Sequence, residues 1–401
     1  MTELPRGAAA VALGLATCLA GGCTSLGERI AQPHSAKLYD VDTLDRMEST
    51  IGVQPARFRT PDGVTLAYAF VPPAMRGMMY TMSRGDGSMT FAIRFGEKTE
   101  TVPTTGSVIF LHGWGLDASS MLPWALALSE LGYQGVVADL RNHGHSSRAP
   151  AGFGTHEAQD VAALVEHLQA EGRLRPPVYL FGVSYGAATA LFAEPLLRDR
   201  VTGIVAMESY AAAGDGVRGF IAGAQADRDD GLHGSLMRAF ARWRYDAPAI
   251  ERGVRQAGQR LGLDLDAIDV RATLAQTATC TLLLHGAGDR YVPVAAARSL
   301  ADASPLVRYR ELPDESHLSL PLRIEWLARP LDAWLQQVAN GECSQLRLPP
   351  DPLAEGGPSQ FSASGMAPAA DAPSTSPVPP GAGTAPSSPT EAVTDEPQLP
   401  R

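Results

Sequence analysis

The sequence predicts an α/β fold, a doubly wound, mostly parallel sheet that carries a helical cap. Short runs that are almost entirely apolar, such as 107–111 and 281–284, alternate with longer helical patterns. Such runs are typical of parallel strands buried on both faces by crossover helices. The alternation breaks at about 210–272, where helical patterns at 236–245 and 250–261 have no strand between them. This interruption predicts the cap over the carboxyl edge of the sheet.

Composition excludes several classes of protein. The chain has 401 residues, of which 45% are hydrophobic, enough for one large or two ordinary domains with a substantial core. Its formal charge is −10 and it has no long basic run, which argues against a nucleic acid partner. The four cysteines show no C-x-x-C or Cys/His spacing typical of zinc sites. We therefore expect no metal and no cofactor, and the oligomeric state is left open.

The N-terminus has the pattern of an export signal. An apolar run at 8–20, too short for a comfortable membrane span, fits a signal peptide over 1–22. The small residues before Cys23 resemble the lipobox of bacterial lipoproteins. That resemblance implies cleavage before Cys23 and lipid on its sulfur, and Thr24 implies sorting to the outer membrane, facing the periplasm. The alternatives are an ordinary cleaved signal peptide and, as a poorer lipid site, Cys18.

After the signal peptide, the chain divides into a tether, a folded domain and a tail. Residues 23–55 read as a lipid-anchored tether and docking segment, and 56–340 as the folded domain. The tail, 349–401, holds 13 of the 31 prolines together with many Ser, Ala and Gly residues, so it cannot bury enough apolar surface to fold. We expect it to be disordered.

The elements of the folded domain begin with a hairpin at 57–70, which turns at Pro-Asp-Gly. Residues 74–105 follow as an inserted hairpin or loop of no readable function. The expected strands after it are 107–111, 135–140, 178–183, 201–207, 281–286 and 307–312. The expected helices outside the cap are 118–131, 155–171, 294–302 and 322–338.

The strand at 178–183 leads into Gly182-Val183-Ser184-Tyr185-Gly186, and a small-residue helix start follows. This G-x-S-x-G in a strand-turn-helix setting is typical of a nucleophile elbow, where flanking glycines remove side chains that would collide. The other interpretation is a Gly-rich turn in which Ser184 caps the helix.

The motifs follow one another in the order HGWG (112–115), DLRNHGHS (139–146), GVSYG (182–186), cap, LLLHGAGD (282–289) and DESH (314–317). This series resembles the α/β-hydrolase superfamily over 57–338, in its esterase-like and serine-aminopeptidase-like branch with a helical cap. The order Ser…Asp…His is also the order expected in that fold.

The resemblance assigns catalytic roles to five residues. Ser184 is the expected nucleophile, His317 its general base, and Asp289 the acid that orients the imidazole. The backbone N–H groups of Tyr185 and Trp114 are the expected oxyanion hole.

Several of these positions have other interpretations. Glu208, after the preceding strand, is a rival acid, Asp289 could cap the helix that begins near Val294, and His317 could be a surface histidine. We interpret His112 as a structural hydrogen-bonding residue. For Asp139, Arg141, His143 and His145 we favour hydrogen bonds that order a loop.

Cys280 opens its strand at the edge opposite the predicted site, and Cys343 follows the last helix. In an oxidising periplasm these residues could form a disulfide. The alternative is a pair of inert buried thiols.

Together these features predict a lipid-anchored serine hydrolase of the cell envelope. It would cleave an ester, thioester or amide through an acyl-serine intermediate, and a carboxylic ester is favoured. The expected partners are a small-molecule or peptide acyl substrate and, through the lipid, a membrane. The alternatives are a peptidase acting on short peptides and a non-catalytic lipoprotein that keeps the fold. A dehalogenase would need an acidic nucleophile at position 184.

Overall fold

The computed structural model describes residues 2–3, 25–33, 35, 49–85, 88–96, 100–226, 244–354 and 357–363. The strands of its central sheet are β2 (Gln54–Arg59), β3 (Thr65–Val71), β8 (Gly106–Leu111), β9 (Tyr133–Ala138), β10 (Val178–Val183), β11 (Gly203–Met207), β12 (Cys280–Gly286) and β13 (Val307–Leu312). They are ordered β13-β12-β11-β10-β8-β9-β3-β2. The six strands from β13 to β9 pair in parallel, and β3 and β2 form an antiparallel hairpin at one edge. This architecture confirms the predicted fold class.

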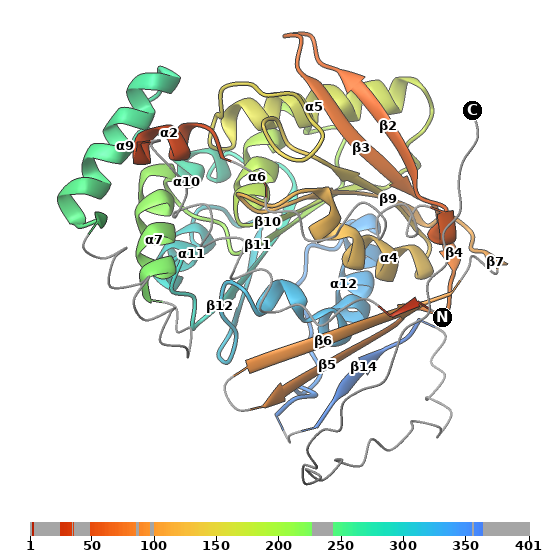
Figure 1. The fold of residues 1–401 in the computed structure, drawn as a ribbon. Helices are drawn as coiled ribbons and strands as arrows, with labels where there is room; N and C mark the ends of the chain where they lie inside the picture. Colours follow the sequence, from red (N-terminus) through yellow and green to blue (C-terminus); the bar gives the residue numbers. More distant parts are fainter. Residues whose placement is uncertain are drawn as a thin grey trace, which may run out of the picture. The chain divides into compact units, whose positions relative to one another are not determined.

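Helices cover both faces of the sheet (Figure 1). One face packs against α5 (Thr155–Ala170), α6 (Tyr185–Leu197) and α11 (Val294–Ala301), and the other against α4 (Leu122–Glu130) and α12 (Ile324–Ala339). The short helices η1 (Ala118–Met121) and η2 (Leu320–Leu322) precede α4 and α12. Alternate residues of one strand enter the two cores, as the twofold period of a strand requires. In β8, Ile109 and Leu111 join the core with α5 and α6, whereas Val108 and Phe110 join the core with α4 and α12.

The segment between β11 and β12 carries the helices α7 (Ala213–Ala226), α9 (Ala247–Leu261) and α10 (Val270–Leu274). The helix α9 begins at the N-cap Asp246, whose side chain accepts a hydrogen bond from the Ala249 N–H (2.8 Å). It ends before Gly262, whose φ of 67° suits glycine. Most of the predicted helix at 236–245 lies outside the described residues. We refer to α7, α9 and α10 as the cap.

A second, smaller sheet is built from the insertion at 74–105. Its strands β5 (Met79–Gly85) and β6 (Ser88–Phe95) form an antiparallel hairpin, and β1 (Thr2–Glu3) pairs with β6. The short strands β4 (Ala74–Met75) and β7 (Glu100–Thr101) close the base of the insertion. The other neighbour of β5 is β14 (Ser359–Phe361), which comes from the far end of the chain.

The strand β14 corrects the predicted boundary of the tail. Residues 349–354 and 357–363 pack on the domain, with Leu353 only 4% and Phe361 only 3% exposed. The Trp326 indole N–H donates to the Pro349 carbonyl (3.0 Å). The prediction from proline content was wrong for this stretch. A few well-spaced apolar residues are enough to order a segment that packs on an already folded surface. Residues 364–401 lie outside the described residues.

Of the N-terminal region, the structure describes α2 (Leu26–Ala31) and its neighbours, whereas Cys18 and Cys23 lie outside the described residues. None of the helices in the described part of the chain has both the length and the apolar character that a bilayer crossing requires.

Candidate active site

The predicted nucleophile lies on a sharp turn between β10 and α6. Ser184 has φ 52°, a conformation that is costly for a residue with a Cβ atom. The flanking glycines are required: a Cβ on Gly182 would lie 2.1 Å from the Gly186 carbonyl oxygen, and one on Gly186 would lie 2.2 Å from the Leu111 carbonyl oxygen. The helix α6 begins directly after Ser184, so its positive end faces the serine.

Two further predicted residues meet Ser184 at the carboxyl ends of the parallel strands. His317 Nε2 lies 3.0 Å from Ser184 Oγ, and His317 Nδ1 lies 2.7 Å from Asp289 Oδ2. Asp289 follows β12 and His317 follows β13, so three loops far apart in sequence converge here. The geometry allows Nε2 to accept the hydroxyl proton while Nδ1–H donates to the carboxylate.

Asp289 is held in place by the backbone of its own loop. Its Oδ1 accepts hydrogen bonds from the N–H groups of Tyr291 (2.7 Å) and Val292 (2.8 Å). These bonds leave Oδ2 facing His317. The helix α11 begins after Pro293, which is its N-cap, so Asp289 does not cap that helix. Burial alone would raise the pKa of Asp289, but hydrogen bonds from His285 and His317 outweigh it and hold the pKa well below its usual range.

The rival acid, Glu208, reaches the same imidazole. It follows β11 with φ 61°, its Oε1 accepts from the Gly286 N–H (3.1 Å), and its Oε2 lies 2.9 Å from His317 Nδ1. Burial raises the pKa of Glu208 to about 7; the nearby Asp289 carboxylate adds to this, while His317 opposes it. Two carboxyl groups so close cannot easily both be ionised, so Glu208 is the one that holds a proton more readily.

The two carboxyl groups also govern the charge of His317. Burial disfavours the imidazolium, but hydrogen bonding to Asp289 and Glu208 outweighs burial and raises the pKa of His317 to about 10. The neutral form, which can accept a proton from Ser184, therefore becomes more abundant as the pH rises.

The same three side chains also have the spacing of a metal site. Glu208, Asp289 and His317 bring one ligand atom each within 4.8 Å of one another. However, both nitrogens of His317 are hydrogen-bonded, Nδ1 to Asp289 and Nε2 to Ser184. The arrangement is better described as an imidazole oriented by carboxylates.

The loop after β8 approaches Ser184 from the other side. A Cβ on Gly113 would lie 3.8 Å from Ser184 Cβ, an ordinary van der Waals distance, so this loop lies directly beside the serine. Trp114 follows on this loop, and Tyr185 is the first residue of α6. The buried His112 holds the loop: Nδ1 bonds with the Gly113 carbonyl (2.8 Å) and Nε2 accepts from the Leu140 N–H (3.0 Å). Burial lowers the pKa of His112 to about 4, so it is a neutral structural residue.

The polar turn after β9 orders the neighbouring loops. Asp139 accepts hydrogen bonds from the N–H groups of Ala118 and His145, both 2.7 Å long. His143 Nε2 accepts from the Gly115 N–H (3.3 Å). Arg141 makes a bidentate ion pair with the buried Asp160, with both bonds 2.7 Å long. These contacts are those of loop-ordering residues, as the sequence favours.

Aromatic residues that the sequence analysis did not single out lie beside the site. The Phe220 ring of α7 is 5.0 Å from Trp114 and 5.5 Å from Tyr291, and Tyr291 is 5.4 Å from the His317 ring. The sequence gives little indication of their position, because a single Phe in a helical pattern is usually a core residue. Together they form an apolar wall next to Ser184, which is itself partly exposed.

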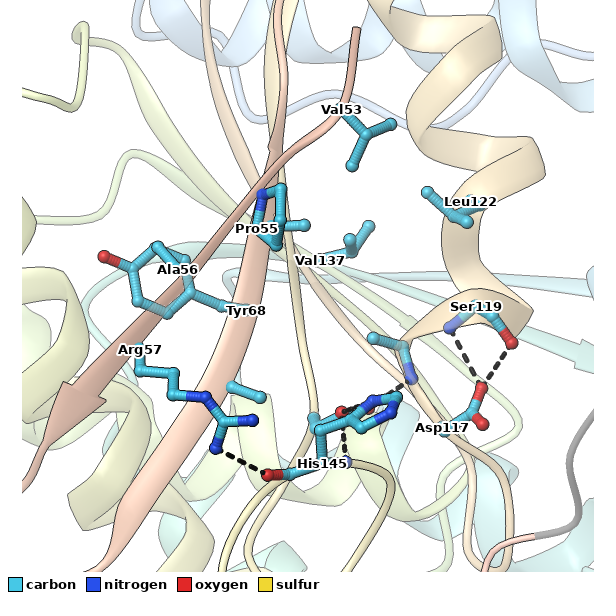
Figure 2. A pocket seen from close by; sticks show the side chains of 14 residues that line it. Val53, Pro55, Ala56, Arg57, Tyr68, Asp117, Ser119, Leu122, Val137 and His145 are labelled. Atoms are coloured by element: carbon cyan, nitrogen blue, oxygen red, sulfur yellow. Dashed lines mark hydrogen bonds and ion pairs between the residues drawn. The ribbon is translucent and has the colours of Figure 1, made fainter. Parts of the chain in front are cut away.

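Figure 2 shows a separate cavity of about 570 Å³ beside the β2–β3 hairpin, with Arg57 and His145 at one end and Val53 and Leu122 at the other. The Arg57 guanidinium donates to the His145 carbonyl (3.4 Å) across this end. The lining residues include none of the three side chains that meet at Ser184. This cavity therefore lies apart from the candidate active site.

Comparisons with known proteins agree with this description. Residues 108–336 match the model of the alpha/beta hydrolase family. Among curated proteins, no sequence matches the chain.

Solved structures share the fold at low sequence identity. Two crystal forms of the esterase Pf2001 of Pyrococcus furiosus are each 16% identical to this chain and cover 78% of it, with TM-scores of 0.51 and 0.52 over 100% and 98% of their own length. A thermophilic esterase from Thermogutta terrifontis is 20% identical, with a TM-score of 0.46 over 71% of this chain and 99% of its own. At 16% identity the likeness to Pf2001 concerns the fold alone.

Proposed function

The chain belongs to the alpha/beta hydrolase family, and we propose that it is a serine hydrolase that cleaves carboxylic esters through an acyl-Ser184 intermediate. The observation that carries the proposal is the hydrogen-bonded series from Ser184 Oγ through His317 to Asp289, at 3.0 and 2.7 Å. A serine hydroxyl is a weak nucleophile unless a base lies within hydrogen-bond reach, and His317 lies within that reach.

In the acylation step, Ser184 Oγ bonds to the carbonyl carbon of the ester while its proton moves to His317 Nε2. The backbone N–H groups of Tyr185 and Trp114 stabilise the oxyanion that forms. The tetrahedral intermediate collapses as His317 protonates the leaving alcohol. In the deacylation step, a water molecule attacks the acyl carbonyl carbon while its proton moves to His317 Nε2. The carboxylic acid then leaves as Ser184 Oγ regains a proton from His317.

Replacement of the nucleophile tests this proposal. Ser184→Ala should reduce hydrolysis of a soluble ester such as p-nitrophenyl acetate by about 10⁴-fold or more. It should also abolish covalent labelling by a fluorophosphonate, because no hydroxyl remains to attack the phosphorus. Steady-state rates and the mass of the labelled protein are the measurements. Ser120→Ala, which alters a hydroxyl of η1, is the control and should keep both properties. Labelling that persists in Ser184→Ala would refute the assignment.

We propose further that the protein is anchored by lipid on Cys23 in the cell envelope, at the periplasmic face of the outer membrane. The apolar run at 8–20 and the small residues before Cys23 support this proposal. The mature protein should remain on phospholipid vesicles after sedimentation, and Cys23→Ser should stay in the supernatant. Equal partitioning of the two proteins would contradict lipid attachment.

A further inference from the structure

The helix α2, close behind the proposed lipid site, packs tightly on the cap. Its residues Leu26, Ile30 and Ala31 are at most 7% exposed and belong to the same apolar core as Val254 and Ala257 of α9. Figure 1 shows α2 lying against α9. Burial of this apolar face stabilises a helix that is too short to persist alone.

The two helices are in near contact along glycine positions. A Cβ on Gly27 would lie 2.5 Å from Gln256 Cβ, and one on Gly253 would lie 2.7 Å from Leu26 Cδ2. A larger side chain at Gly27 would collide with Gln256 Cβ and the Gly253 carbonyl oxygen, and one at Gly253 would displace the Leu26 side chain. At the rim, Glu28 and Arg260 form an ion pair (3.3 Å). The contact is therefore a specific docking of α2 on the cap.

The cap connects α2 to the loop that carries Asp289 in the candidate active site. Arg218 of α7 pairs with Glu251 of α9 (2.7 Å), which joins the two helices. A Cβ on Gly219 would lie 2.3 Å from the Tyr291 carbonyl oxygen, so α7 packs closely on the loop that carries Asp289. Phe220, between Trp114 and Tyr291, completes the apolar wall beside Ser184.

Only one residue separates Cys23 from Ser25, the N-cap of α2. A fully extended chain spans at most about 3.6 Å per residue, so lipid on Cys23 would begin within about 7 Å of Ser25. The chain after α2 is held as well, because Ser35 Oγ accepts from the Gly144 N–H (2.8 Å). A docked anchor of this length keeps one side of the protein against the bilayer, which a long flexible tether would not do.

We infer that α2, docked on α9, holds the cap at the membrane surface, so that the substrate is an acyl ester resident in a bilayer that reaches Ser184 beneath the cap. This inference rests on the proposed hydrolase function and on the proposed lipid at Cys23. The apolar wall of Trp114, Phe220 and Tyr291 provides a path suited to an acyl chain.

The test compares one soluble ester with one bilayer ester. The full mature lipidated protein is reconstituted on vesicles of phosphatidylethanolamine and phosphatidylglycerol that contain a fluorogenic long-chain glycerol ester, and p-nitrophenyl acetate is the soluble substrate. Gly27→Leu should force α2 off α9 without touching the active site. Gln259→Leu adds the same side chain at an exposed position of α9 and is the matched control.

We expect Gly27→Leu to hydrolyse the acetate at the wild-type rate but the vesicle ester about tenfold more slowly, because the orientation of the bound enzyme is lost. Gln259→Leu should match the wild type on both substrates. Loss of the acetate rate in Gly27→Leu would reveal that this variant fails to fold. In that case Leu26→Ala is the milder variant, and it should also keep the acetate rate and lose the rate on the vesicle ester. Equal vesicle rates in wild type and an undocked, folded variant would overturn the inference.

The outcomes also separate this inference from its premises. A wild type inactive on every ester would refute the proposed hydrolase. A wild type active on the acetate, but unable to hydrolyse the vesicle ester while bound to the vesicles, would overturn the bilayer substrate alone. Loss of vesicle binding in the wild type would overturn the role of the anchor and leave the hydrolase intact.

Discussion

At the scale of residues, the unusual feature is a histidine shared by two carboxyl groups. Asp289 makes the short contact with His317 Nδ1 (2.7 Å), while Glu208 lies nearly as close (2.9 Å). Asp289 also contacts a second buried histidine, His285, whose Nε2 is 3.2 Å from Oδ2. One N–H cannot serve both acids equally well, so we expect Asp289 to orient the imidazole and Glu208 to act on its charge.

The roles of the two acids predict different pH profiles. Glu208→Gln removes one of the two groups that raise the pKa of His317. The neutral base should therefore form at lower pH, and the rise of kcat/KM with pH should shift downward by on the order of one pH unit. The measurement is the pH–rate profile with a soluble ester.

Asp289→Asn serves as the comparison for Glu208→Gln. It should lower kcat by about 10⁴-fold, because an amide favours the wrong imidazole tautomer. Glu208→Gln should keep most of kcat at its new optimum. A pH–rate profile unchanged by Glu208→Gln would show that this carboxyl group does not act on the charge of His317. A large loss of kcat in Glu208→Gln would show that Glu208, and not Asp289, orients the imidazole.

At the scale of elements, a buried ionic cluster joins the small sheet, the His317 loop and the segment after α12. Glu315, two residues before His317, pairs with Arg84 of β5 (2.8 Å) and with Arg323. Arg323 is fully buried and also contacts Glu325 (2.7 Å) and Asp351. The insertion at 74–105 thus has a structural consequence that its sequence does not reveal, since β5 helps to hold the loop of the proposed base.

Removal of the central cation of this cluster should be costly. Arg323→Met leaves the buried carboxylate of Glu325 without its cation and leaves Glu315 with Arg84 alone. The free energy of unfolding should therefore fall by about 3–5 kcal/mol. Urea denaturation is the measurement. Arg310→Met, at an exposed position of β13, should cost less than about 1 kcal/mol. Similar losses in both variants would mean that the cluster does not hold this region together.

At the scale of the whole molecule, a covalent link complements the packing on both faces of the sheet. Cys280, at the start of β12, and Cys343, after α12, form a disulfide. The bond joins positions 63 residues apart, and closing a loop of this length contributes about 4 kcal/mol by restricting the unfolded chain. It lies at the strand ends opposite Ser184, so it strengthens the scaffold and does not touch the candidate active site.

The sequence by itself indicated which segments of the chain form the parallel strands and that Ser184 follows one of them. Apolar runs, turn residues and the glycines around the elbow act over a few residues, so their consequences can be read locally. It also indicated Asp289 and His317 as partners, and both lie beside Ser184 in the structure.

Only the tertiary structure decided that Glu208 and Asp289 both reach one imidazole, that α2 docks on α9, and that β14 (Ser359–Phe361) joins the small sheet. These contacts connect positions tens to hundreds of residues apart. They depend on distances set by the packing of the complete domain, and no local pattern encodes such distances.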